Sequence, residues 1–329
     1  MLMDDLSGAP VSPPWGTGQA KSVAAQRFAL LAKILVSGAL LVFLSRKIDW
    51  PGESLRLAGA ALKPLLAALG LLVIAVVLAA LRWRMLVQRG GSRMPVTTAA
   101  QLTFAGMFFG QVLPATVGGD VVRGALACRI GLPWRDVVSG IVLDRITALL
   151  ASVILILAGL PRLYTLAVGD AVPLVWTALA SMGLVGVVGL ALCGDLLPLP
   201  RVLTRWIWVA AALDLTKQVR SGLSSAAGLA ALAISIVIHL STVAVVILIG
   251  AGLGVPVSLL AAFVVVPLAI LAAAVPISLN GWGIREGIMV AGFALFGISS
   301  GDALLISILL GFGVILSVLP GSLTWLALR

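Results

Sequence analysis

The sequence predicts an all-α polytopic membrane protein with about six full spans and two interrupted, re-entrant helical hairpins in an inverted repeat. The first observation is composition: 61% of the 329 residues are hydrophobic and only 10% are charged. A soluble domain has about 45–50% apolar and about 25% charged residues. The second observation is a series of long apolar runs, and the third is a pair of segments in which Pro, Gly and charge interrupt such runs. Lipid must therefore be much of the solvent around this chain.

The apolar runs divide the chain into a tail and one membrane domain. Residues 1–26 are rich in Pro, Gly, Ser and Ala, which is typical of a disordered cytoplasmic tail and not of a signal peptide. Residues 27–329 form the single transmembrane domain, with repeat halves at about 28–160 and 172–328. Each full span needs about 20 apolar residues. The predicted spans are 28–45, 65–82, 137–160, 172–193, 228–250 and 302–328.

Two regions between the spans, about 97–133 and 258–298, have a different pattern. In the first, an apolar run is followed by a piece at 118–131 that is too short and too charged to cross lipid alone. This pattern predicts a re-entrant hairpin. The second region fits either a re-entrant hairpin or two tilted spans. Non-helical backbone at membrane depth is tolerated only inside protein or along a watery cavity.

A further segment, 198–225, interleaves basic residues with Trp and aliphatic side chains. This pattern favours an amphipathic helix on the inner leaflet, and an ordinary solvated loop helix is the alternative.

The distribution of basic residues predicts the orientation. The formal net charge is +10, but the sequence has no long soluble basic segment, which argues against nucleic acid as a partner. With both termini inside and both hairpins re-entrant, 14 Lys and Arg residues fall on the inside and 5 on the outside. The inside set includes Arg82 and Arg123, counted as loop residues. This asymmetry follows the positive-inside rule and predicts a multi-pass cell membrane protein with cytoplasmic termini.

The two interrupted regions resemble each other. The first reads LPATVGGDVVRG from Leu113, and the second reads VPISLNGWGIRE from Val275. One constant offset, close to half the chain, pairs three positions: Pro114 with Pro276, Gly119 with Gly281, and Arg123 with Arg285. Because three full spans separate the regions, the second hairpin enters from the opposite face. Paired breaks of this kind indicate the substrate site of a transporter, although Pro and Gly could also simply kink packed spans.

Charged and glycine residues near the breaks are the candidate substrate-binding residues. An arginine fork matches phosphate oxygens, so Arg123 and Arg285 are expected to face one headgroup in a shared cavity. Glycine-rich turns let backbone amides approach an anion at a helix start. The counter-ions are Asp120 and Glu286, and a purely structural ion pair is the alternative role. The glycines of the two turns are Gly118, Gly119, Gly281 and Gly283.

A second candidate pair, Asp144 and Arg145, lies inside the predicted span 137–160. Buried charge in a span is costly and indicates function. Adjacent helical residues point about 100° apart, so each is expected to reach a different partner. His239 is expected to be a hydrogen-bonded packing residue rather than a proton relay. With this one histidine and two unspaced cysteines, the sequence predicts no metal site and no cofactor.

These motifs together resemble a known family. LPATVGGDVVR, the intramembrane Asp-Arg at 144–145 and PISLNGWGIREG are similar to the lysylphosphatidylglycerol synthase transmembrane region, a flippase-like family, over about residues 28–328. The family often has Glu where this chain has Asp120 and Asp144, and an acid where it has Thr147.

The resemblance implies transport of a lipid and no enzyme activity. We expect flipping or scrambling of an anionic or polyprenyl-phosphate-type lipid in a bacterial inner membrane. The sequence ends at Arg329, directly after the last predicted span, so we expect a separate lipid-synthesising enzyme as partner. No P-loop is present to hydrolyse ATP. The alternatives are a membrane-embedded lipid or glycosyl transferase and a small-ion transporter or channel.

Overall fold

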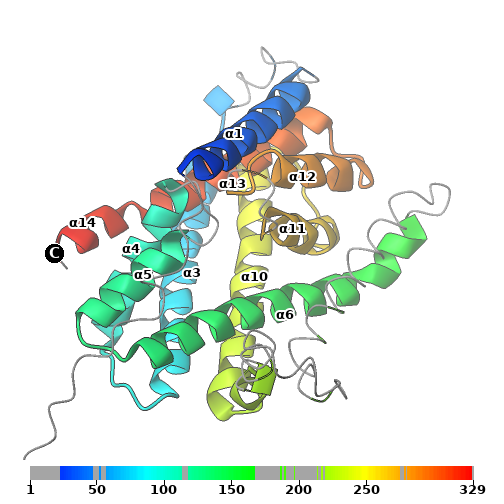
Figure 1. Ribbon diagram of the computed structural model, residues 1–329. Helices are drawn as coiled ribbons and strands as arrows, with labels where there is room; N and C mark the ends of the chain where they lie inside the picture. The colour runs from blue at the N-terminus through cyan, green and yellow to red at the C-terminus, as the bar shows by residue number, and fades with distance from the viewer. Residues whose placement is uncertain are drawn as a thin grey trace, which may run out of the picture.

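The computed structural model describes residues 23–46, 57–112, 118–166, 219–274 and 280–327, with a few single positions between them. Helices form all the regular secondary structure of these segments, which confirms the predicted all-α class (Figure 1). Their order is α1 (Val23–Ser45), α3 (Leu62–Gln88), α4 (Val96–Val112), α5 (Gly118–Arg129), α6 (Trp134–Leu166), α10 (Ala226–Gly252), α11 (Leu259–Ala274), α12 (Ile284–Ala294), α13 (Ser300–Val318) and α14 (Pro320–Ala327).

Four helical stretches in the described segments are long and apolar enough to cross a membrane. They are Leu62–Gln88, Trp134–Arg162, Ala226–Gly252 and Ser300–Leu326, and they coincide with four of the six predicted spans. The first predicted span lies in α1, which begins at Val23 and so includes residues that the sequence assigns to the tail. The predicted span 172–193 and most of the predicted amphipathic segment 198–225 lie outside the described residues.

The most extensive described contact between helices joins α3 and α10, which run antiparallel. The amide of Ala61, just before α3, donates to the carbonyl of Gly252, the last residue of α10, at 2.8 Å. Near the other end, Nη1 of Arg82 on α3 donates to Oγ of Ser235, early in α10, also at 2.8 Å. Both helices have 27 residues. The start of each helix therefore lies beside the end of the other.

The same order of helices occurs twice. A long helix, two short helices and another long helix recur as α3–α6 and as α10–α13. The spacing between equivalent starts is nearly constant and close to half the chain: α3 and α10 begin at Leu62 and Ala226, α4 and α11 at Val96 and Leu259, and α6 and α13 at Trp134 and Ser300. Because α3 and α10 are antiparallel, the two short-helix hairpins that follow them begin at opposite ends of this pair.

Glycines let the helices of the hairpins approach closely. On α4, a Cβ at Gly106 would stand 2.8 Å from Cβ of Arg123 and 2.9 Å from the carbonyl oxygen of Gly119, both on α5. In the second hairpin, a Cβ at Gly292 on α12 would stand 2.8 Å from a methyl carbon of Val265 on α11. The two prolines of the breaks, Pro114 and Pro276, lie outside the described residues.

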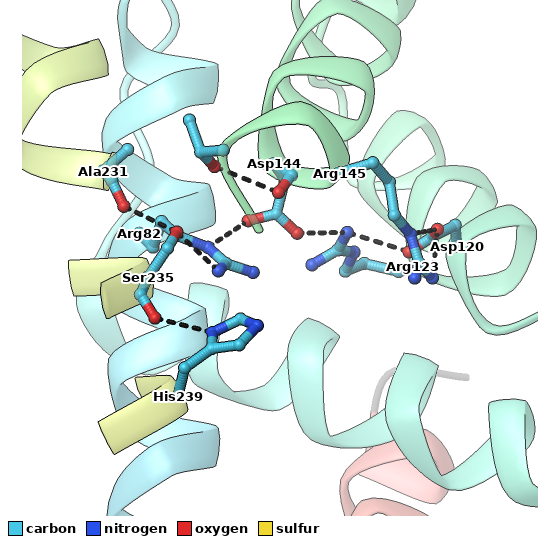
Figure 2. A network of polar contacts seen from close by, with 9 residues as sticks. Arg82, Asp120, Arg123, Asp144, Arg145, Ala231, Ser235 and His239 are labelled. Atoms are coloured by element: carbon cyan, nitrogen blue, oxygen red, sulfur yellow. Dashed lines mark hydrogen bonds and ion pairs between the residues drawn. The ribbon is translucent and has the colours of Figure 1, made fainter. Parts of the chain in front are cut away.

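Buried apolar side chains form clusters between the helices. One cluster joins α3 and α10 to α11, α12 and α13 and includes Val246, Ala262 and Ile306. Another joins α3, α4, α5 and α6 around Trp83 and Leu102. Polar side chains from α3, α5, α6 and α10 meet beside the second cluster, where Arg123 lies over the Trp83 ring (Figure 2).

Candidate functional site

Asp144 links three helices. Its Oδ1 accepts from Nε of Arg82 on α3 at 2.7 Å, and its Oδ2 accepts from Nη2 of Arg123 on α5 at 3.2 Å. Asp144 and Arg123 are each 5% exposed, and Arg82 is 7% exposed. Paired buried charges of this kind are strongly destabilising to separate. The carboxylate therefore holds α3 and α5 against α6 (Figure 2).

Asp120 makes a second bridge beside the first. Its Oδ1 accepts from Nη2 of Arg123 at 2.9 Å, and its Oδ2 lies 2.6 Å from Nε and Nη2 of Arg145. Asp144 and Arg145 thus reach different partners, as their directions on α6 require. The Arg145 side chain is 57% exposed, whereas its partner Asp120 is buried. Arg145 is therefore the exposed member of a network of charged side chains that is otherwise buried.

The network carries an excess of positive charge. It contains three arginines and two aspartates, which leaves a net charge of +1. The guanidinium carbon of Arg123 also lies 4.5 Å from the centre of the Trp83 ring, a cation–π contact. Among the described groups, Nε of Arg123 and Oγ1 of Thr103 are buried without a hydrogen-bond partner. This centre can therefore accept a further anionic or hydrogen-bonding group.

The structure corrects the placement of Arg82 and Arg123. The charge count for the orientation placed both among cytoplasmic loop cations, although the motifs also placed Arg123 at a cavity beside Asp120. Both side chains are buried in the charged network. Arg82 lies three residues after the buried Ala79, on the face of α3 that packs inward. Helical periodicity was thus the signal that could have placed it inside. Its position near the end of an apolar run resembled the start of a loop instead.

His239 on α10 borders the network. Its Nδ1 lies 2.8 Å from the carbonyl oxygen of Ser235, and its Nε2 lies 2.6 Å from Oγ of Ser152 on α6. The ring is buried and hydrogen-bonded at both nitrogens. Sequence reasoning missed Ser235, which joins His239 to Arg82, since a serine in an apolar helix gives no distinct signal. The other intramembrane cation, Lys33, has its side chain outside the described part.

The second hairpin holds a more local ion pair. Arg285 pairs with its neighbour Glu286, and Nη2 of Arg285 donates to the carbonyl of Ser307 at 3.1 Å. Glu286 is 0% exposed, and its Oε2 accepts from the amide of Gly283 at 2.6 Å. The Trp282 ring centre lies 5.0 Å from the guanidinium carbon of Arg285. The Gly283 amide, predicted to approach an anion, is therefore occupied by the hairpin's own carboxylate.

Two neighbouring cavities meet beside Arg145. The first, of about 240 Å³, is lined by Arg82, Arg123, Arg145, Gly119, Asp120 and Asp144 among others. The second, of about 260 Å³, is lined by Arg285, Trp282 and residues of α11 and α13. Three residues line both: Gln111, Arg145 and Asn280. Arg123 and Arg285 thus line adjacent cavities. The lining of these two cavities does not include Gly118, Gly281, Gly283 or Glu286.

The described side chains suit an anion better than a metal. They contain no group of three or more His, Cys, Asp or Glu residues that could hold a metal ion. Both aspartates of the first cavity are already engaged by arginines. The site offers guanidinium groups in a partly enclosed space, the chemistry that binds phosphate and carboxylate groups.

Fold and site together define a polytopic α-helical membrane protein with two short helical hairpins and a buried arginine–aspartate centre, to which the first hairpin contributes Asp120 and Arg123. The chain belongs to the family described as the lysylphosphatidylglycerol synthase TM region, whose model matches residues 30–321. This membership confirms the family that the sequence motifs indicated. The chain matches no curated protein and no solved structure.

Proposed function

We propose that this protein translocates an anionic phospholipid or a polyprenyl-phosphate-type lipid between the two leaflets. The headgroup passes through the two cavities while the acyl chains stay in the bilayer. One observation carries this proposal: the half-exposed guanidinium of Arg145 lines both cavities and is therefore available to a headgroup in either.

The charge of the cavities supports an anionic headgroup. Four arginines and two aspartates line them, which gives a net charge of +2. All four arginines pair with buried acids, but Arg145 is the one with most of its side chain exposed, at 57%. A planar guanidinium binds two phosphate oxygens at once. Arg145 therefore acts as the headgroup ligand, and the buried arginines set the positive potential around it.

The helix arrangement supports an inverted repeat around the cavities. The hairpins begin at opposite ends of the antiparallel pair α3–α10. The 11-residue helix α12 is roughly 16 Å long at 1.5 Å per residue, about half of a hydrocarbon core of about 30 Å. A helix of this length fits a re-entrant arm better than a tilted span. Transporters place their substrate site between interrupted helices of this kind.

The first cavity also has an apolar, exposed wall. Met107 on α4 lines it and is 37% exposed, which suits an opening of the cavity toward lipid. Val121 on α5, one residue after Asp120, is exposed as well. An apolar side chain facing lipid beside a cationic cavity suits an amphipathic substrate. The headgroup can bind inside while the chains remain in the hydrocarbon.

The membrane orientation follows from the basic residues at one end of the bundle. Arg89, Arg129 and Arg135 lie near the end of α3, at the end of α5 and at the start of α6. By the positive-inside rule, this end is cytoplasmic, and both termini lie inside. Arg162 lies about 28 residues further along α6 than Trp134, roughly 42 Å away. Cysteines introduced at positions 129 and 162 should therefore react with an impermeant label from opposite sides, and labelling from the same side would contradict this orientation.

The function is tested by leaflet-to-leaflet transport of labelled lipids in proteoliposomes. The wild-type protein should move a lipid with a phosphate-containing anionic headgroup, and Arg145→Gln should slow this movement at least about tenfold by removing a charge-assisted contact. Arg46→Gln is the matched control, because Arg46 is an exposed cation at the end of α1 outside both cavities. Absence of transport by the wild-type protein with every anionic lipid class tested would refute the proposal. Equal rates for Arg145→Gln and wild type would refute the role of Arg145.

A further inference from the structure

The breaks of the two hairpins touch each other through one amide pair. Nδ2 of Asn280, in the turn before α12, donates a hydrogen bond to Oε1 of Gln111, one residue before the end of α4. The two residues are 169 positions apart in the chain. The hairpins begin at opposite ends of α3–α10, so this contact is where their inner ends meet.

The amide pair also lies between the cavities. Gln111 and Asn280 are lining residues of both, together with Arg145. Arg123 lines only the first cavity and Arg285 only the second. A headgroup that moves from one cavity to the other must therefore pass these three side chains. Of the three, only Arg145 attracts the anion by charge.

The packing of each hairpin holds the pair in place. Asn280 has a φ of 51°, a left-handed conformation that Asn tolerates better than most residues. The next residue, Gly281, has a φ of 82°, and a Cβ there would stand 2.5 Å from Cβ of Ala273. On the other side, α4 is fixed by the close approach of Gly106 to α5. The backbone segments that carry the two side-chain amides therefore have little freedom to move apart.

We infer that Gln111 and Asn280 form the crossing point of the transport path, and that opening of their mutual hydrogen bond controls the passage of the headgroup. The inference rests on the proposed lipid transport. A neutral amide pair suits this role, because breaking it strands no buried charge, unlike breaking Arg285–Glu286. Each amide can also donate to a phosphate oxygen as it passes. Transport selectivity and rate in membrane pathways commonly depend on such lining groups.

A reversible crosslink tests whether the contact must open. Cysteines replace Gln111 and Asn280 in a protein whose Cys128 and Cys193 are changed to Ala, and a short bifunctional thiol reagent joins them through a reducible bond. Transport should fall to background when the pair is crosslinked and return on reduction. Each single-cysteine protein, treated identically, is the control for modification alone. Undiminished transport through the crosslinked protein, or failure of the pair to crosslink, would overturn the inference.

Removal of each side-chain amide tests whether the hydrogen bond between Gln111 and Asn280 slows transport. Gln111→Ala keeps a good helix former, and Asn280→Gly suits the left-handed backbone, so neither change adds strain. Each should raise the transport rate about fivefold, the ratio that one net hydrogen bond supplies. Unchanged or slower transport with unchanged thermal stability would overturn the inference. If the wild-type protein itself moves no lipid, the proposed function fails instead, and the two failures are therefore distinguishable.

Discussion

The two hairpin arginines, Arg123 and Arg285, follow similar sequence motifs but have different surroundings. Arg123 is shared between Asp120 on its own helix and Asp144 on α6. Arg285 pairs with the adjacent Glu286 and reaches Ser307 on α13. The first arginine therefore ties two helices together through charges, whereas the second is neutralised within its own helix.

The difference originates in the long helices that follow the hairpins. Ser307 on α13 accepts a hydrogen bond from Arg285, and Asp144 on α6 accepts one from Arg123. A serine thus occupies the approximate position in the second unit that the central aspartate occupies in the first. The first unit keeps a net charge of +1, and the Arg285–Glu286 pair is neutral. If the protein transports lipid as proposed, the comparison predicts that the first hairpin holds the headgroup and that the second serves as a brace.

The largest effect is expected for Asp144→Asn. The change leaves Arg82 and Arg123 buried with one carboxylate fewer, so the free energy of unfolding should fall by about 5 kcal/mol, the upper end for a broken buried pair. Ser307→Ala is the matched change in the second unit and should cost only about 1 kcal/mol. Thermal and denaturant unfolding in detergent measures both. Equal losses would show that the two units are held in the same way.

A smaller loss of about 3 kcal/mol is expected for Glu286→Gln, because the largely buried Arg285 loses its partner and still donates to the carbonyl of Ser307. The Gly283 amide can still donate to the Gln oxygen, so the start of α12 should persist. Transport per folded molecule should stay near the wild-type rate if this hairpin is a brace. A specific loss of transport without loss of stability would instead place Arg285 among the headgroup ligands.

Arg145→Lys should separate transport from stability. The lysine keeps the charge but loses the planar fork, so transport should fall about tenfold, corresponding to one charge-assisted hydrogen bond of roughly 1.5 kcal/mol. The unfolding free energy should change by less than about 1 kcal/mol, since the side chain is more than half exposed. Arg46→Lys gives the baseline for both measurements. Wild-type transport by Arg145→Lys would mean that a point charge is sufficient in the cavity.

The smallest effects concern the glycines that pack the hairpins. Gly106→Ala should destabilise by about 1–3 kcal/mol, because its Cβ would press on the carbonyl of Gly119 and on Cβ of Arg123, which have little room to move. Gly292→Ala should cost less, about 1 kcal/mol, because its Cβ would press on the side chain of Val265 and on no backbone atom, and alanine adds about 1 kcal/mol of helix propensity. Unfolding midpoints of the two variants provide the comparison. The reverse order would make the second hairpin the more tightly packed one.

The sequence by itself determined the membrane class, the positions of both hairpins and most residues of the charged centre. These features are local: apolar length defines a span, and charge beside Pro and Gly defines a break. The sequence did not reveal that Arg82 is buried, because an arginine at the end of an apolar run resembles the start of a loop. The sequence also predicted one shared cavity for Arg123 and Arg285, whereas in the structure they line two adjacent cavities.

Only the tertiary structure decided which polar and charged side chains meet. Arg82 reaches Asp144 across 62 residues and Ser235 across 153, and Gln111 reaches Asn280 across 169. Such pairs depend on how the helices pack against one another. This packing is set by the shapes of apolar helix surfaces, which leave no short motif in the sequence. The physical reason is that burial of charge is tolerated only where a partner is present, and the partner here is supplied by a different helix.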